Sequence, residues 1–182
     1  MIIGLTGTIG AGKGTIVEYL TREHGFYHAS AREFLTREIA RRGLPLTRAS
    51  MVSVADDFRK NYQPEFGYMV LALLAEARSS GKDAVIESVR AVGEMETLRK
   101  ACPEIIFIGI DADPKIRFER IRGRGSVTDD IDFQKFLADD AKESGSKEPW
   151  RGNLPLCISL SDHQIVNNGD KEELYAALEK LI

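Results

Sequence analysis

Nine residues near the start of the chain constrain its fold more than any other segment. They run from Gly7 to Thr15 with the sequence Gly-Thr-Ile-Gly-Ala-Gly-Lys-Gly-Thr, between a short apolar segment and a helical one. Glycines allow backbone N–H groups to converge on a concave nest, and the following helix adds the positive end of its dipole. A tight turn alone does not need four glycines, a lysine and a hydroxyl in this order. The segment therefore predicts a loop that binds phosphate groups, with Lys13 as a mobile positive charge.

Two details of this loop narrow its chemistry. Its glycines follow the order G-x-x-G-x-G, whereas a dinucleotide-binding turn needs G-x-G-x-x-G. The strict pattern has Ser or Thr directly after the lysine, but Gly14 stands there and Thr15 comes one residue later. We therefore expect Mg²⁺ to be held through waters and the phosphates of ATP, near Thr15 and Glu87, without a direct protein ligand. The loop residues predicted to bind ATP are Gly7, Gly10, Ala11, Gly12, Lys13, Gly14 and Thr15.

Strand-like and helical segments alternate along the rest of the chain, as in a parallel sheet with crossover helices. The five predicted strands cover residues 1–6, 26–29, 84–87, 105–111 and 164–167. The fourth of these reads IIFIGID and is almost continuously apolar, as expected for a strand buried on both faces. The pattern predicts an α/β fold of three layers, with a five-stranded parallel sheet and helices on both faces.

The predicted helices divide the chain into three regions of one domain. Helices are expected over residues 15–23, 30–42, 47–62, 64–80 and 133–142, from Pro114, and after Asp170. Capping signals start two of them, because Ser30 precedes Glu33 in a capping box and Asp170 precedes Glu173. Residues 30–80 form a mainly helical insert between two strands, and residues 123–153 form a second, more polar one. The core then comprises residues 1–29, 81–122 and 154–182.

Composition excludes several classes of protein. The 182 residues suffice for one domain with its own core, and 25 basic against 28 acidic residues leave a net charge of −3. This balance does not favour a nucleic-acid partner. The two cysteines, Cys102 and Cys157, indicate neither a zinc site nor a disulfide framework. Apolar runs are too short to span a membrane, and no basic, apolar leader follows Met1, so we expect a cytoplasmic protein.

The order of motifs resembles that of the nucleoside monophosphate kinases, such as adenylate kinase. The glycine-rich loop looks like theirs, and Ser30-Ala-Arg-Glu-Phe-Leu35 is similar to the family's Ser-Thr-Gly-Asp-Met-Leu, where the acceptor nucleotide enters. Glu87-Ser-Val-Arg90 stands where the family has Asp-Gly-x-Pro-Arg. Glu119-Arg-Ile-Arg-Gly-Arg124 resembles the Asp-Arg-x-x-Gly-Arg that opens the lid. Val166-Asn-Asn-Gly169 matches the loop that the family places against the donor base.

This resemblance implies a P-loop kinase that uses ATP and Mg²⁺ in nucleotide metabolism, as a monomer or small homo-oligomer with a small-molecule nucleotide acceptor. It implies that Lys13, Arg120 and Arg124 act on the transferring phosphate, and that Asn168 and Gly169 border the donor base. For the acceptor it implies Ser30, Arg37, Glu87 and Arg90, with Arg90 on the acceptor phosphate. It also implies that residues 30–80 are an acceptor-binding insert and residues 123–153 a lid. The family usually has Asp in place of Glu87, whose extra methylene shifts the carboxylate by about 1 Å.

Several polar residues have less specific interpretations. Arg117 and Arg122 are expected on the surface, and Asp111 is expected to cap the helix that begins at Pro114. Arg48 and Arg59 lie in the insert, like Arg37, and their contact with the acceptor stays open. Trp150 suits either base stacking or packing at a lid hinge. The acidic run Asp129, Asp130, Asp132, Asp139 and Asp140 is expected to be a solvated face.

Two further functions compete with this reading. Dephospho-coenzyme A kinase resembles the chain in Ile3-Gly-Leu-Thr-Gly7 and Ile165-Val-Asn-Asn-Gly169, but usually carries Asp-x-Asp where this chain has His28-Ala-Ser30. A nucleotide-hydrolysing switch module would use Asp111 at the end of the fourth strand. The short chain and the arginines of the lid region suit phosphate transfer better than regulated hydrolysis.

Overall fold

The chain forms one parallel sheet of five strands, as the sequence predicts. The computed structural model describes residues 1–62, 65–123, 132–144 and 150–182. The strands are β1 (Ile2–Gly7), β2 (Tyr27–Ser30), β3 (Ala84–Glu87), β4 (Ile106–Asp111) and β5 (His163–Val166). Their order in the sheet is β2-β3-β1-β4-β5, and all neighbours run parallel. The predicted α/β class, strand number and direction are confirmed.

The register brings the polar strand ends to one edge of the sheet. Leu5 of β1 pairs with Glu87 of β3, and Ser30 of β2 pairs with the same Glu87. On the other side of β1, Gly7 pairs with Ile110 of β4. The carboxyl ends of four strands therefore meet where β1 turns into the glycine-rich loop, which is where ligands bind in open α/β sheets.

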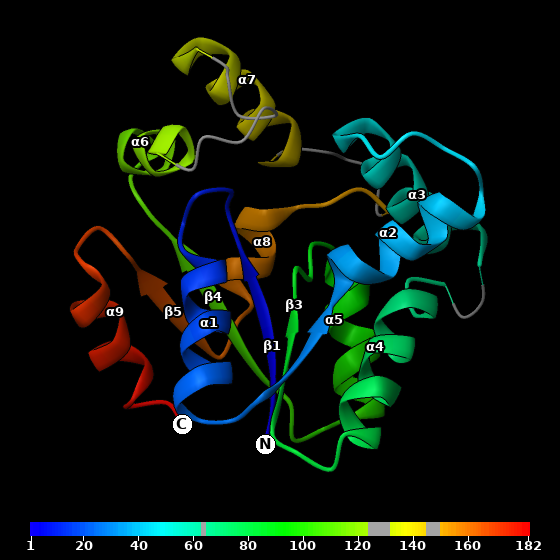
Figure 1. Cartoon of the computed structure of the whole chain (residues 1–182), viewed down its shortest axis with the longest axis horizontal. Coiled ribbons are helices and arrows are strands. Elements are labelled where there is room, and N and C mark those ends of the chain that lie inside the picture. Colours follow the sequence, from blue (N-terminus) through cyan, green and yellow to red (C-terminus); the bar gives the residue numbers. More distant parts are fainter. Residues whose placement is uncertain (63–64, 124–131, 145–149) are drawn as a thin grey trace.

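Helices cover both faces of this sheet (Figure 1). On one face α1 (Lys13–Glu23) and α9 (Lys171–Leu178) bury Leu20 and Leu174 in a cluster with Leu5. On the other face lie α4 (Tyr68–Ser79), α5 (Val92–Ala101) and the short α8 (Leu154–Ser159), where Leu73 and Phe107 are fully buried. Because the central strands are apolar on both sides, each face closes over its own core.

The remaining helices gather at the carboxyl end of the strands, away from the two termini (Figure 1). They are α2 (Ala31–Arg41), α3 (Arg48–Asn61), α6 (Pro114–Gly123) and α7 (Phe133–Ser144). Ser30 caps α2 through the N–H of Glu33, 3.2 Å away, as predicted. In the described part of the chain, no helix is both long and apolar enough to cross a bilayer.

Some boundaries and elements differ from the sequence prediction. The helix expected over residues 64–80 begins at Tyr68, and the two helices α5 and α8 were not predicted. In α5 the N-cap is Ala91, whose N–H is bound by the Glu94 side chain, so no polar cap residue marks its start. The six residues of α8 are too few to show a helical period. Most of the loop expected over residues 123–132 lies outside the described residues.

Candidate functional site

The glycine-rich loop is a tight cradle between β1 and α1. Gly10 and Gly12 adopt φ values of 80° and 116°, which L side chains rarely adopt. A Cβ on Gly10 would lie 2.6 Å from the carbonyl oxygen of Arg117, and one on Gly12 would lie 2.5 Å from Nδ2 of Asn167. Lys13 Nζ donates to the carbonyls of Gly7 and Thr8 at 2.6 and 2.8 Å. The loop thus has the close packing and the central cation that phosphate binding requires.

Two side chains from other elements hold the outer carbonyls of the loop. Arg117 Nη1 of α6 donates to the carbonyl of Ile9 at 3.3 Å. Asn167 Nδ2, which follows β5, donates to the carbonyl of Ala11 at 2.7 Å. Both side chains are buried, with Asn167 7% exposed and Arg117 3% exposed. The conformation of the loop therefore depends on residues more than 100 positions away.

Asp111 contacts the loop and does not cap α6. Its Oδ1 accepts from the hydroxyl of Thr8 at 2.5 Å and from the N–H of Ala112 at 2.8 Å. Asp113 binds the first turn of α6 instead, through the N–H of Lys115 at 2.8 Å. The predicted cap is wrong by two residues because Asp111 still belongs to β4, where its side chain reaches the neighbouring loop.

Arg117 is buried, so its expected place on the surface is wrong. Its Nη1 and Nη2 donate to the two carboxylate oxygens of Asp140 on α7, each at 2.7 Å. Burial opposes the charged form, but the bonds and charge of Asp140 outweigh it and raise the pKa of Arg117 above its ordinary value. Arg122, on the same helix, is exposed as expected.

Arg120 turns toward the segment between β5 and α9. Its guanidinium donates to the carbonyls of Asn167 and Gly169 at 2.8 and 2.9 Å. The side chain of Asn168 accepts from the N–H of Asp113 at 2.8 Å. The segment expected to bind the base is thus held by Arg120 of α6 and by the N–H of Asp113, directly before α6. The phosphate role of Arg120 stays a prediction. Arg124 lies outside the described residues.

A cavity of about 530 Å³ opens at the carboxyl ends of β2 and β3. Its lining residues are His28, Ser30, Arg32, Glu33, Thr36, Arg37 and Glu87. Glu87 Oε1 lies 3.5 Å from the hydroxyl of Ser30 and 3.6 Å from Nε2 of His28. Burial alone would raise the pKa of Glu87, but His28, Lys13 and Ser30 outweigh burial, and the pKa lies below its ordinary value. The carboxylate is therefore ionised at neutral pH.

The structure shows the surroundings of three arginines whose contact with the acceptor is predicted or left open by the sequence. Arg37 lines the cavity and pairs with Glu76 at 3.0 Å. Arg90 does not line it. Arg59 is 5% exposed and binds Glu94 at 2.7 Å, so it is a buried ion-pair partner and not an acceptor contact.

Arg90 is held through its backbone. Its N–H donates to Glu94 Oε2 at 2.9 Å, and its carbonyl accepts from the N–H of Asn153 at 2.8 Å. Because Glu94 also binds Arg59 of α3, one buried carboxylate joins the insert to the segment that carries Arg90. The side chain of Arg90 is half-buried.

The other residues without a predicted role fall at the edges of the site. Arg48 is the exposed first residue of α3. Lys60 Nζ lies 4.8 Å from the ring centroid of Trp150, which favours the hinge-packing interpretation of this tryptophan. Asp132 binds the N–H of Lys135 at the start of α7. Asp129 and Asp130, and the side chain of Asp139, lie outside what the structure describes.

Comparison with known proteins assigns the chain to a family. The model of a family described as "AAA domain" matches residues 3–146. The UPF0200 protein TK1334 of Thermococcus kodakarensis is 32% identical over all of this chain and 96% of its own length. The chain belongs to the AAA domain and UPF0200 families. A second UPF0200 relative, MJ1399 of Methanocaldococcus jannaschii, is 26% identical over all of this chain and 89% of its own length.

Solved structures give the UPF0200 chain the fold of the P-loop kinases. TT1252 from Thermus thermophilus matches with a TM-score of 0.65 and 18% identity, over 100% of this chain and 95% of that one. A shikimate kinase from Bacteroides thetaiotaomicron matches with a TM-score of 0.61 and 14% identity, over 100% and 96%. A gluconokinase from Sinorhizobium meliloti matches with a TM-score of 0.56 and 14% identity, over 98% and 91%. At these identities the likeness concerns the fold alone.

The loop of the UPF0200 chain has two features that a phosphate-binding loop needs. A Cβ at Gly10 or Gly12 would collide with neighbouring atoms, and Lys13 brings its charge to the same loop. For Mg²⁺ the predicted neighbours, Thr15 and Glu87, would offer a hydroxyl and a carboxylate oxygen. Among the described residues, no group of three or more His, Cys, Asp or Glu side chains could hold a metal ion. Oxygen donors of these two kinds are ones that Mg²⁺ takes, and the binding of Mg²⁺ through waters stays a prediction.

Sequence reasoning missed three residues that shape the site of the UPF0200 chain: Arg117, Asp140 and Asn167. Asn167 directly precedes the two residues predicted to border the donor base. The side chain of Asn167 is buried, whereas that of Asn168 is exposed. The alternation of side chains along β5 could have indicated that neighbouring asparagines point to opposite sides. No signal in the sequence pairs Arg117 with Asp140, because they belong to different helices.

Proposed function

We propose that the chain is a phosphotransferase that moves the γ-phosphate of ATP to a nucleoside or deoxynucleoside monophosphate, giving ADP and a diphosphate. The observation that carries this proposal is the cavity of about 530 Å³ at the carboxyl ends of β2 and β3. It lies next to the glycine-rich loop because β3 pairs with β1. Ser30, Arg37 and Glu87, three of the four residues predicted for the acceptor, line it. Its size suits a small-molecule ligand.

The chain's residues act in this reaction by position and charge. Bound ATP with Mg²⁺ supplies the phosphoryl group. Lys13, now bonded to loop carbonyls, moves its ammonium to the phosphate oxygens, and the loop amides hold them in place. Arg90 grips the acceptor phosphate with two parallel hydrogen bonds. The metal is held through waters near Thr15 and Glu87.

Further residues complete the donor side. Arg120 and Arg124 neutralise the charge that develops on the transferring phosphate. Asn168 and Gly169 border the base of ATP, in a segment that Arg120 already contacts. The insert and the lid exclude water, which would compete with the acceptor.

The pair of Glu87 and His28 favours a second candidate, in which the acceptor is a hydroxyl, as in dephospho-coenzyme A kinase. A phosphate acceptor is already anionic and needs no base, whereas a hydroxyl must lose its proton during attack. Glu87 is ionised, lines the cavity and lies 3.6 Å from His28 Nε2. In this candidate Glu87 accepts the proton, and His28 stabilises the carboxylate beforehand.

An acceptor panel tests the two candidates. ADP formation is measured with each ribo- and deoxyribonucleoside monophosphate and with dephospho-coenzyme A, using the Lys13→Ala chain as the control for contaminating kinases. We expect one or more monophosphates to stimulate ADP formation well above the rate without acceptor. Stimulation by dephospho-coenzyme A alone would support the hydroxyl candidate, and ATP hydrolysis that no acceptor increases would contradict both.

The Glu87→Gln variant separates the candidates further. If the acceptor is a hydroxyl, loss of the base lowers kcat by about 10²–10⁴-fold. If the acceptor is a phosphate, the variant removes a negative charge from the cavity, so the acceptor binds as tightly as before or more tightly. The effect of the variant on activity then depends on the Mg²⁺ concentration. Glu33→Gln, in the same cavity but exposed, is the matched control.

A further inference from the structure

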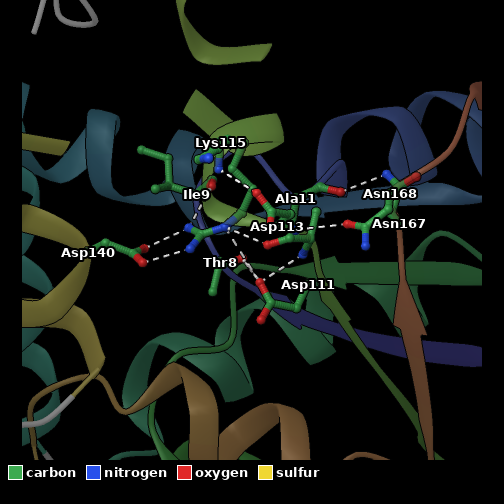
Figure 2. Close-up of polar contacts among 12 residues, drawn as sticks. Thr8, Ile9, Ala11, Asp111, Asp113, Lys115, Asp140, Asn167 and Asn168 are labelled. Atoms are coloured by element: carbon green, nitrogen blue, oxygen red, sulfur yellow. Dashed lines mark hydrogen bonds and ion pairs between the residues drawn. The ribbon is translucent and has the colours of Figure 1, made fainter. Parts of the chain in front are cut away.

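Arg117 is the centre of a buried network that joins the phosphate loop to α7. Figure 2 shows its labelled members Ile9, Asp111 and Asp140 around one guanidinium. Its Nε donates to the carbonyl of Ala112 at 3.0 Å and its Nη1 to the carbonyl of Ile9 at 3.3 Å. Both terminal nitrogens bind Asp140 at 2.7 Å, and Asp111 Oδ1 lies 3.6 Å from Nε. The guanidinium is therefore held from three places at once: the phosphate loop, the end of β4 and α7.

The bond to Ile9 decides the direction of the next amide. In a trans peptide the carbonyl oxygen and the N–H of the following residue point to opposite sides. Holding the carbonyl of Ile9 toward Arg117 turns the N–H of Gly10 away from α6. Asn167 acts in the same way on the peptide between Ala11 and Gly12. Its bond to the carbonyl of Ala11 turns the N–H of Gly12 away from Asn167. Two loop amides are thus oriented before any phosphate arrives.

Asp140 keeps Arg117 in this position. Bidentate carboxylate bonds fix the plane of a guanidinium, which a single bond does not. The ring of Phe136, one turn earlier on α7, lies 5.3 Å from the guanidinium carbon and is 2% exposed. A buried arginine that lost Asp140 would keep two carbonyl partners and the more distant carboxylate of Asp111, but no bidentate partner, so its side chain would reorient toward water. The Ile9 carbonyl would then lose its donor.

We propose that Arg117 is a positioning residue for the donor phosphates, and that Asp140 of α7 sets the affinity of the loop for ATP through it. This inference rests on the proposed function only in naming ATP as the ligand. By this inference α7 changes the affinity for ATP without touching ATP. In the alternative arrangement, Asp140 masks the charge of Arg117, which would otherwise bind phosphate directly. Replacement of Asp140 would then raise the affinity for ATP instead of lowering it.

Binding to the whole chain, measured by titration calorimetry without acceptor, tests the proposal. For Asp140→Asn we expect ATP affinity to fall roughly tenfold, as for loss of one charge-assisted hydrogen bond. Adenosine binding, which does not involve the loop amides, should stay unchanged. Arg117→Lys should reproduce the loss, because an ammonium lacks the planar fork, and the double variant should lose little more than either single one. Arg122→Lys on α6 and Asp132→Asn, directly before α7, are the matched controls.

Each outcome decides the matter. Unchanged or tighter ATP binding in Asp140→Asn overturns the proposal, and tighter binding establishes the masking arrangement. Equal losses for ATP and adenosine, with a lowered Tm, mean that the network serves only the fold. If the unaltered chain binds neither ATP nor pyrophosphate, the proposed function fails and this inference fails with it. Unaltered ATP affinity in the variants overturns this inference alone.

Discussion

Lys13 carries the charge of the phosphate loop, and it donates to two carbonyls of that loop. Its ammonium bonds to the carbonyls of Gly7 and Thr8, and α1 begins at the same residue. Neither of the two buried clusters of apolar residues includes Lys13. Its removal should therefore affect chemistry much more than folding.

For Lys13→Ala we expect turnover to fall by about a hundredfold or more, with the Tm almost unchanged, because a charge at the developing transition state is lost. Steady-state ADP formation and thermal unfolding measure the two effects. Lys100→Ala, an exposed lysine on α5, is the control. Turnover near that of the unaltered chain, in a folded variant, would refute the kinase proposal.

Arg90 tests the acceptor side at the same scale. For Arg90→Lys we expect the acceptor KM to rise several-fold at least while ATP affinity changes little, because an ammonium cannot form two parallel bonds to one phosphate. One charge-assisted hydrogen bond contributes about 1.5–3 kcal/mol. Titration with each substrate separately makes the measurement, with Arg22→Lys as the control. Equal weakening for ATP and acceptor would assign Arg90 to the transferring phosphate or to the fold.

At the scale of elements, the insert is held together by charges on α2 and α3. Glu38 of α2 accepts from Arg41 and Arg42, and Arg42 also binds Asp57 of α3 at 2.6 Å. The guanidinium of Arg42 lies 5.3 Å from the ring centroid of Phe58 in the insert core. A cluster of this kind makes the insert a unit whose stability depends on pH.

The pH dependence follows from Glu38, whose pKa is lowered from 4.5 to about 2, mainly by its bonds to Arg41 and then to Arg42, against the effect of burial. A carboxyl with a lowered pKa stabilises the folded state above its unfolded pKa, and this contribution disappears as the pH falls toward the folded pKa. Glu38→Gln should therefore lower the urea midpoint at pH 6.5, and the difference should shrink between pH 4.5 and 2. Comparison of the two proteins at each pH cancels the other carboxyls. An equal difference at pH 6.5 and pH 3 would contradict the assignment.

At the scale of the whole molecule, α2, α3 and α7 lie over the carboxyl end of the sheet, opposite the termini (Figure 1). Both substrates meet beneath them in the proposed reaction. Closure of residues 30–80 and 123–153 would exclude water from the phosphates. The limits of these two regions stay predictions from the sequence.

Hydrogen exchange should report this closure. With a bisubstrate analogue we expect backbone amides of α2, α3 and α7 to gain protection, while ADP alone protects mainly the loop and α1. The amides of β1 and β4, buried in the sheet, are the internal reference. Unchanged protection of all three helices with the analogue would contradict closure.

Most of the fold was within reach of the sequence because its signals are local. Glycine spacing specified the phosphate loop, apolar runs specified five strands, and polar residues at Ser30 and Asp170 marked helix starts that the structure confirms. The predicted third strand, residues 84–87, matches β3 at both ends. Each of these signals depends on φ/ψ preferences or burial within a few residues, so a linear pattern contains it.

Only the tertiary structure decided which distant side chains hold the site. Arg117 and Asp140 look like surface charges along the chain, yet folding buries one guanidinium against one carboxylate and the Ile9 carbonyl. Glu94 caps α5, holds Arg90 and binds Arg59, which no spacing rule predicts. The physical reason is that burial of a charge is costly unless a partner arrives at the same place, and that partner is chosen by how helices pack rather than by their sequence separation.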